Sequence, residues 1–181
     1  MKIHLFGASG AGVTTLGTTL EAPYFDSDDY FWGPSNGPFA VRRPKNECNA
    51  LLTHDLARGP RWVLSGSLGW GTWGEQPLTI LDLAMFLWLP PALRLRRLRQ
   101  REHARYGDVT IASPARAAQT KAFLAWATDY DDGFCGGGRT PANHTAWLEC
   151  LACPVLALRC DLTVTKQLNA VLAQVARLGL H

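Results

Sequence analysis

The stretch Gly7-Ala8-Ser9-Gly10-Ala11-Gly12-Val13-Thr14-Thr15 decides the fold of this chain. It follows a short apolar run and precedes residues with helical spacing, so we expect it to connect the first strand to the first helix. Its glycines allow a turn whose backbone N–H groups converge, and the helix adds the positive end of its dipole. Such a turn is suited to binding phosphate.

The stretch has the Walker A pattern with one departure. Thr14 occupies the position whose hydroxyl binds Mg²⁺ in that pattern, but the residue before it is Val13 where a lysine should reach the β- and γ-phosphates. Losing such a charge costs about 3 kcal/mol of transition-state stabilisation, unless another cation takes its place. The departure therefore bears on catalysis more than on binding, and Gly7 to Thr15 are all expected to contact the nucleotide.

Apolar runs of strand length alternate with helical stretches along the rest of the chain. The expected strands are Ile3 to Phe6, Pro23 to Phe25, Trp62 to Leu64, Leu83 to Leu89 and Val155 to Leu158. The expected helices are Thr14 to Leu20, Glu47 to Ala57, Pro91 to Tyr106, Ala115 to Tyr130, Pro141 to Leu151 and Thr163 to Leu178. This alternation predicts an α/β fold with a five-stranded parallel sheet between two layers of helices.

Composition indicates one nucleotide-binding domain spanning residues 1–181. A hydrophobic content of 47% suffices for one core, and a net charge of +3 fits an anionic small ligand better than a nucleic acid. The N-terminus resembles a strand more than a signal peptide, and no run approaches the ~18 apolar residues of a membrane span. The five cysteines lack framework spacing, so we expect reduced thiols in a cytoplasmic protein.

An acidic cluster, Asp26-Ser27-Asp28-Asp29, follows the second strand. In a doubly wound sheet the carboxyl ends of neighbouring strands open onto one crevice, so these carboxylates should face the phosphates. The third strand ends in Ser65-Gly66 without an acid, which makes the cluster the best source of a ligand for Mg²⁺ or of a base for an acceptor hydroxyl. An ordinary acidic turn is the alternative.

Together with Gly66 and an arginine-rich helix after strand four, these motifs resemble the adenylate kinase-like superfamily of small P-loop kinases. The Asp-x-Asp spacing is more similar to shikimate and gluconate kinases than to nucleoside monophosphate kinases. Segments Phe25 to Trp32, Val63 to Ser67 and Tyr130 to Gly133 also resemble uncharacterised bacterial adenylate kinase-like ATPases. The resemblance implies the strand order 2-3-1-4-5, a metal role for Asp26 and an acceptor-hydroxyl role for Asp28.

Arginines Arg97, Arg101 and Arg105 recur at i, i+4 spacing on the predicted helix after strand four. One interpretation is a solvated amphipathic helix, helped by Glu102. The resemblance implies instead a lid, within about residues 94–115, that closes over the triphosphate. Arg97 or Arg101 could then supply the charge that Val13 lacks.

Residues about 27–60 form the region where the resembling kinases bind their acceptor. Candidates for acceptor contact are Asp29 and Arg43 there, with Gly66 and Trp70 after the third strand. Arginine pairs with anionic groups, and tryptophan in a glycine-rich loop stacks on rings, although both residue types also serve ordinary packing.

Two functions are consistent with this sequence. The first is an ATP-dependent small-molecule kinase that uses Mg²⁺ and an unidentified acceptor. The second is a nucleotide-binding module, or a slow NTPase, whose Walker A motif has lost its lysine. A nucleic-acid partner is not favoured, because the basic residues concentrate on one helix and no RNA-binding module is present.

Overall fold

The computed structural model describes residues 1–35, 39–67, 80–107, 113–133, 139–159 and 161–180. Its strands are β1 (Lys2–Gly7), β2 (Tyr24–Asp26), β3 (Trp62–Ser65), β4 (Leu83–Trp88) and β5 (Val155–Arg159). Its helices are α1 (Val13–Gly17), α2 (Ser27–Phe31), α3 (Lys45–Leu56), α4 (Pro91–Tyr106), α6 (Pro114–Asp132), α7 (Pro141–Glu149) and α8 (Val164–Arg177).

The strands form one sheet in the order β2-β3-β1-β4-β5, as predicted, and every pairing is parallel. The register places Leu5 of β1 opposite Ser65 of β3, and Asp26 of β2 opposite the same serine. The carboxyl ends of the first three strands therefore meet at one edge. The turn that follows β1 and the acidic cluster that follows β2 share this edge.

Alternate residues of the buried strands serve two cores, one on each face of the sheet. Ile3 and Leu5 of β1 pack into a cluster with Leu16 of α1 and Val171 of α8. Phe6 packs into the other cluster, which α3 and α7 cover. Each face of a parallel sheet needs such a helical cover, because strands buried on both sides are apolar throughout.

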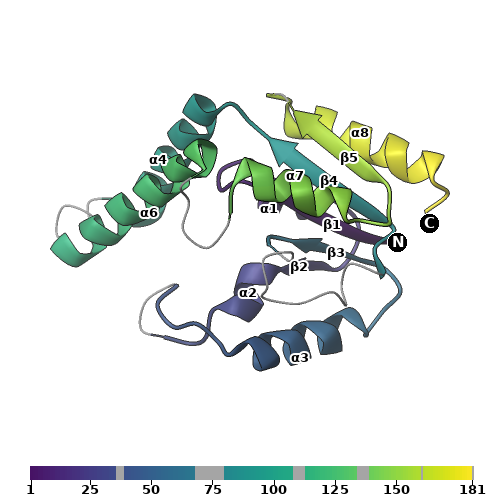
Figure 1. Cartoon of the computed structure of the whole chain (residues 1–181), viewed down its shortest axis with the longest axis horizontal. Helices are drawn as coiled ribbons and strands as arrows, with labels where there is room; N and C mark the ends of the chain where they lie inside the picture. The colour runs from purple at the N-terminus through teal and green to yellow at the C-terminus, as the bar shows by residue number, and fades with distance from the viewer. Residues whose placement is uncertain (36–38, 68–79, 108–112, 134–138, 160, 181) are drawn as a thin grey trace.

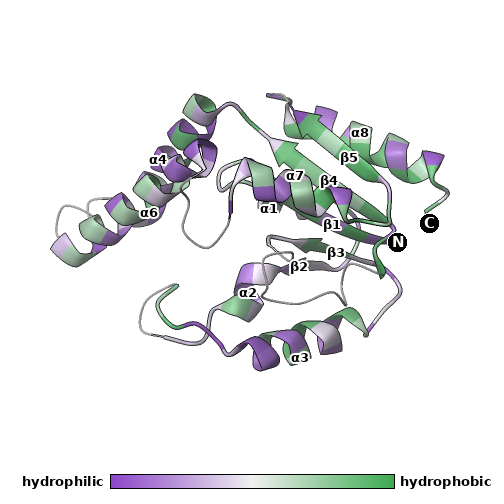
Figure 2. Cartoon of the chain, in the orientation of Figure 1, coloured by the Kyte–Doolittle hydropathy of each residue, from purple (hydrophilic) through white to green (hydrophobic). Residues whose placement is uncertain are grey.

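Figures 1 and 2 show how the elements are layered. Strands β4 and β5 consist mostly of hydrophobic residues, whereas α4 carries many hydrophilic ones. Helices α4 and α6 lie against each other and extend beyond the sheet, while α2 and α3 lie on the β2 side of the molecule. Among the described residues, no helix combines the length and apolarity that crossing a membrane requires.

The predicted helices all form, with two differences. Helix α1 ends at Gly17 and not at Leu20, and the close approach of Tyr24 to Gly17 leaves no room for a side chain there. Helix α2 was not predicted. It is a single turn within the acidic cluster, and the Asp26 carboxylate caps it by accepting a hydrogen bond from the Asp28 N–H.

Candidate nucleotide-binding site

A pocket of about 590 Å³ opens at the carboxyl edge of the sheet, within the size range of small-molecule sites. The sequence-predicted residues that line it are Gly7, Ala8, Ser9, Gly10, Ala11, Gly12, Val13, Thr14, Thr15, Asp26, Asp28, Gly66, Arg97 and Arg101. It is also lined by Arg105 of the arginine-rich helix and by Ser65, Leu98, Arg139, Leu162, Thr163, Val164 and Gln167. The phosphate-binding turn, the acidic cluster and the arginine helix thus share one cavity.

The turn between β1 and α1 has the conformation that the glycines predict. Gly12 caps the N-terminus of α1 with φ 97°, a left-handed conformation that side chains disfavour. The Ala11 N–H donates to the carbonyl of Ala8 at 3.0 Å, which closes the turn. The backbone of residues 7–15 consequently surrounds one end of the pocket.

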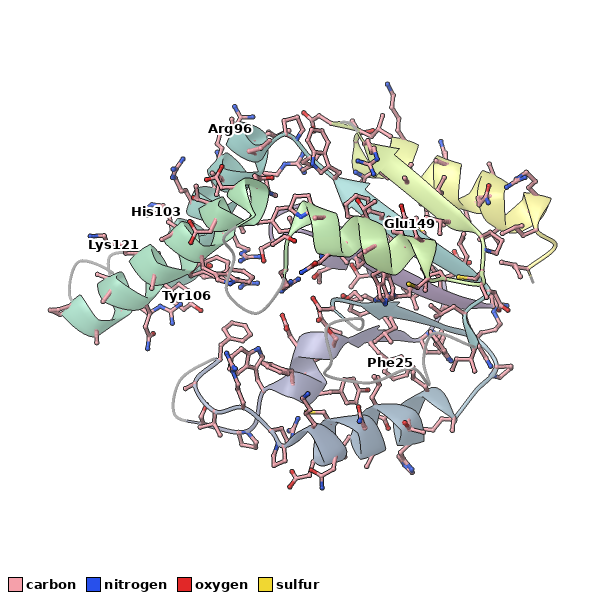
Figure 3. The ribbon with its side chains drawn as sticks, in the orientation of Figure 1. Phe25, Arg96, His103, Tyr106, Lys121 and Glu149 are labelled. Atoms are coloured by element: carbon pink, nitrogen blue, oxygen red, sulfur yellow. The ribbon has the colours of Figure 1, made fainter. Side chains whose placement is uncertain are left out.

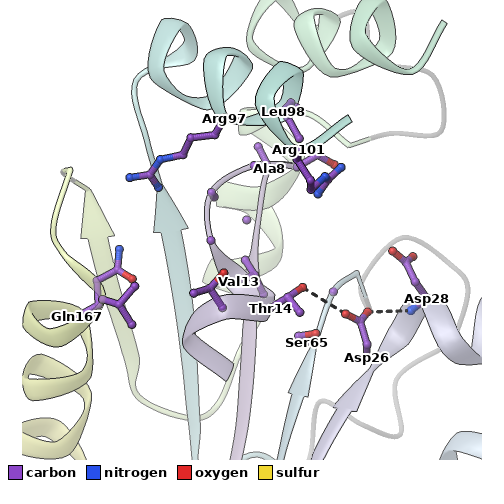
Figure 4. Close-up of a pocket in the computed structure, with 18 of the residues that line it drawn as sticks. Ala8, Val13, Thr14, Asp26, Asp28, Ser65, Arg97, Leu98, Arg101 and Gln167 are labelled. Carbon is purple, nitrogen blue, oxygen red and sulfur yellow. Dashed lines mark hydrogen bonds between the residues drawn. The ribbon is translucent and has the colours of Figure 1, made fainter. Parts of the chain in front are cut away.

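Thr14 and Asp26 form the candidate metal site. The Thr14 hydroxyl donates to Oδ2 of Asp26 at 3.4 Å, and both side chains line the pocket (Figure 4). Adjacent oxygen ligands of an octahedral Mg²⁺ lie about 3 Å apart, and the ion keeps several waters. The hydroxyl and carboxylate therefore suit a Mg²⁺ ion that is held mainly by phosphate, water and these two residues.

Asp28 faces the same pocket with a carboxyl that is harder to ionise than usual. Desolvation within the pocket raises the pKa of Asp28, and the charge of Asp26 adds to the effect, while Arg139 opposes it. A carboxylate with a raised pKa is a better acceptor of a proton from a hydroxyl. The arrangement can thus place a base close to the metal site.

Gly66 is held at the pocket by contacts that exclude any side chain. Its φ is 98°, and an added Cβ would lie 1.8 Å from Oγ of Ser27. Its carbonyl lies 2.9 Å from Nε2 of His4, so this nitrogen carries the proton and donates. Burial lowers the pKa of His4 to about 4, which keeps the ring neutral.

The pocket-facing arginines of α4 differ in their surroundings. Arg97 is paired with Asp161 at 2.9 Å, on the α8 side of the pocket. Arg101 points into the space between the turn and Asp28 (Figure 4), and its nearest acid is Glu102 at 3.6 Å. Burial and the neighbouring charge of Arg105 lower the pKa of Arg101. An anion beside Arg101 would offset this cost, so Arg101 is better placed than Arg97 to replace the missing lysine.

Val13 occupies the position at which the Walker A pattern has a lysine. Its side chain packs against the core cluster that contains Leu16, Leu158 and Val171. Position 13 therefore contributes to the packing of α1 on the sheet.

Arg94 is a residue of the site that the sequence analysis missed. It is 1% exposed and donates to the carbonyls of Ser9 and Ala127 and to the carboxylate of Asp131. These bonds tie α4 and α6 to the phosphate-binding turn. The position lies one helical turn before the buried Leu98, and that spacing was the available signal.

The candidates for acceptor contact lie in different places. Gly66 lines the pocket, whereas Asp29 and Arg43 lie outside its lining. The Arg43 guanidinium donates to the carbonyls of Asp29 and Tyr30, so it holds α2 in place. Trp70 lies outside the described residues. Contact of these residues with an acceptor stays a prediction.

The fold is that of the adenylate kinase-like P-loop kinases. The chain matches a shikimate kinase from Acinetobacter baumannii, solved in complex with shikimate, with a TM-score of 0.54 and 16% identity over 99% of this chain and 95% of that one. An uncharacterized protein from Eubacterium ventriosum ATCC 27560 matches with a TM-score of 0.50 and 10% identity over 97% and 98% of the two chains. At such low identity these likenesses show the fold alone.

The chain belongs to the family of the uncharacterized protein YqaC of Bacillus subtilis (strain 168). The two sequences are 38% identical over 175 residues, which cover 94% of this chain and 95% of YqaC. No protein-family profile matches the chain.

Proposed function

We propose that the protein is a phosphotransferase that binds a Mg²⁺–nucleoside triphosphate at residues 7–15 and transfers its γ-phosphoryl group to a small molecule. The observation that carries the proposal is the meeting of Thr14 and Asp26 at 3.4 Å, in a pocket that Asp28 and Arg101 also line. A metal site, a base and a cation are the parts that phosphoryl transfer requires, since its catalysis is mostly positioning and electrostatics.

In this proposal the backbone N–H groups of the turn hold the β- and γ-phosphates. Thr14 and Asp26 hold Mg²⁺, which neutralises charge on the transferred group when bound. Asp28 accepts the proton of the acceptor hydroxyl, while Arg101 stabilises the phosphoryl oxygens in place of a lysine. The acceptor lies between Asp28 and Arg139, whose opposite charges suit a hydroxylated molecule that also carries an anionic group.

A second candidate is a nucleotide-binding module or slow NTPase. It is favoured by Val13, because this side chain packs against the core cluster and the turn has no lysine of its own. The two functions differ in turnover. A kinase consumes ATP faster when its acceptor is present, whereas a binding module holds the nucleotide with little hydrolysis.

Titration calorimetry with Mg²⁺–ATP tests the shared step. Gly12→Val should abolish binding, because a branched side chain at φ 97° forces the turn to change shape. Gly179→Val is the matched control, since Gly179 also has a positive φ, with an open surrounding and a position outside the pocket lining. Absence of Mg²⁺–nucleotide affinity at millimolar concentration would reject the proposal. Where wild type binds Mg²⁺–ATP, a metabolite screen for accelerated ATP consumption would identify the acceptor.

A further inference from the structure

Tyr24 of β2 carries a hydroxyl that lies behind the candidate metal site. Successive residues of a strand point to opposite faces, so Tyr24 and Asp26 share one face of the sheet, while Phe25 packs into the core on the other face. The ring of Tyr24 packs against the core cluster that contains α1, in the space that Gly17 leaves free. Its hydroxyl donates to Oδ2 of Asp26 at 3.2 Å. Packing thus fixes the ring, and the hydroxyl is directed at a residue of the metal site.

Ser65 of β3 bonds to the same hydroxyl. Its Oγ lies 2.6 Å from the Tyr24 oxygen, and the residue is 1% exposed. A tyrosine hydroxyl has a single proton, and an ionised carboxylate can only accept. Because the Tyr24 proton is donated to Asp26, the Ser65 hydroxyl must donate to the Tyr24 oxygen. The two hydroxyls therefore form a chain of donors that ends on Asp26.

Three hydrogen bonds orient the carboxylate of Asp26. Oδ1 accepts from the Asp28 N–H at 3.1 Å, and Oδ2 accepts from the hydroxyls of Tyr24 at 3.2 Å and Thr14 at 3.4 Å. Figure 4 shows the bonds from Thr14 and Asp28, with Ser65 beside Asp26. The hydroxyl oxygen of Thr14 is itself a candidate ligand of the metal ion, whereas the Tyr24 hydroxyl is not among the described groups that line the pocket. Tyr24 can therefore hold Asp26 from behind while the pocket is occupied.

We propose that Tyr24 is a positioning residue of the metal site, which acts through Asp26 and is supported by Ser65. The inference rests on the proposed function, because it requires that Asp26 holds Mg²⁺. Hydrogen bonds to a ligating carboxylate fix its orientation, and loss of such a partner typically lowers metal affinity by about 10- to 100-fold. Packing explains the ring of Tyr24, which phenylalanine would also supply, but not the hydroxyl.

Titration calorimetry of the full chain with ATP, in Mg²⁺ and in EDTA, tests the proposal. Wild type should bind the Mg²⁺ complex more tightly than metal-free ATP. Tyr24→Phe keeps the ring and should weaken binding of the Mg²⁺ complex about tenfold or more, with unchanged affinity for metal-free ATP. Tyr30→Phe is the matched control. It removes a hydroxyl that donates to the Asp55 carboxylate at 2.9 Å, away from the pocket lining, and should change neither affinity.

Ser65→Ala tests the supporting role of Ser65. This change should weaken binding of the Mg²⁺ complex less than Tyr24→Phe does. In the Tyr24→Phe background it should add nothing, because Ser65 acts through the Tyr24 hydroxyl. Ser65 also lines the pocket, so an effect that is undiminished in the double variant would indicate direct contact with the ligand and overturn the supporting role.

The remaining outcomes separate this inference from the proposed function. If Tyr24→Phe leaves both affinities unchanged, or weakens them equally, the role of Tyr24 at the metal site is overturned while the nucleotide site stands. If wild type fails to bind Mg²⁺–ATP, or binds it no more tightly than metal-free ATP, the metal site of the proposed function is rejected, and the role of Tyr24 with it.

Discussion

Arg94 and Arg101 lie seven residues apart on α4, but one is buried behind the phosphate-binding turn and the other faces the pocket. Arg94 is bonded to two carbonyls and a carboxylate. Arg101 is 39% exposed and has Glu102 beside it at 3.6 Å. Cations of one helix can therefore serve opposite purposes. A buried, fully paired cation holds the shape of a site, whereas a partly exposed cation that lines the pocket is available to a ligand.

Replacing Arg94 should have the largest effect on stability. Arg94→Met leaves the Asp131 carboxylate and the Ser9 and Ala127 carbonyls without their donor, and breaking a buried pair in this way costs about 3–5 kcal/mol. Urea unfolding measures the loss. The control is Arg96→Met, because Arg96 is exposed and points outward from α4 (Figure 3), and a change of about 0.5 kcal/mol or less is expected. Equal effects of the two changes would contradict the role of Arg94.

Two buried histidines, His4 and His144, differ from these arginines because they remain neutral in the folded protein. Burial lowers the pKa of His4 to about 4 and that of His144 to about 3. His4 contacts the Gly66 carbonyl, and His144 lies 2.7 Å from the Tyr130 hydroxyl, with the charge of Arg139 also opposing its protonation.

Acid should therefore destabilise the fold through these rings. The unfolded histidines take up protons near pH 6.5 and the folded ones do not, so the free energy of unfolding falls as pH drops from about 6.5 to about 4. Each pKa unit corresponds to about 1.4 kcal/mol, which gives a loss on the order of 3 kcal/mol for His4. Urea unfolding in His4→Gln should show a shallower pH dependence than wild type. The exposed His103 offers the control His103→Gln, and equal slopes in all three proteins would refute the prediction.

Replacing Asp28, which lines the pocket together with Asp26, should change the activity and not the stability of the protein. Asp28→Asn should lower phosphoryl transfer about 10²-fold, because the amide cannot accept the hydroxyl proton, and should leave the melting temperature nearly unchanged. Asp132→Asn is the control, since Asp132 is exposed and lies outside the pocket lining. A lower melting temperature with unchanged activity would assign Asp28 to the turn alone.

Most of the architecture could be predicted from the sequence, because local patterns determine it. Apolar runs located all five strands, and the glycine spacing located the turn that follows β1. The position of Asp26 at the end of the second predicted strand placed a carboxylate at the edge where the phosphate-binding turn lies, and in the structure Asp26 and Thr14 lie 3.4 Å apart there.

The rest depends on contacts that the sequence does not encode locally. Helix α2 has a single turn made of residues common in loops, so no period reveals it. Arg94 looked like its neighbouring arginines, because only the packing of α4 on α6 selects it for burial. Gln167 is a polar residue on the mostly apolar face of α8, and only the folded structure shows that it lines the pocket.

The central claim is that Arg101 replaces the missing lysine, and a double-mutant cycle with Val13 tests it. Arg101→Ala should lower phosphoryl transfer by about 10²- to 10³-fold. Val13→Lys should partly rescue that variant yet add little to the activity of wild type. Val13→Met is the control for packing that is lost at position 13. Arg97→Ala should couple more weakly to Val13→Lys, because the charge of Arg97 is paired with Asp161. Additive effects without rescue, together with a higher nucleotide affinity of Val13→Lys alone, would contradict the claim and favour the nucleotide-binding module.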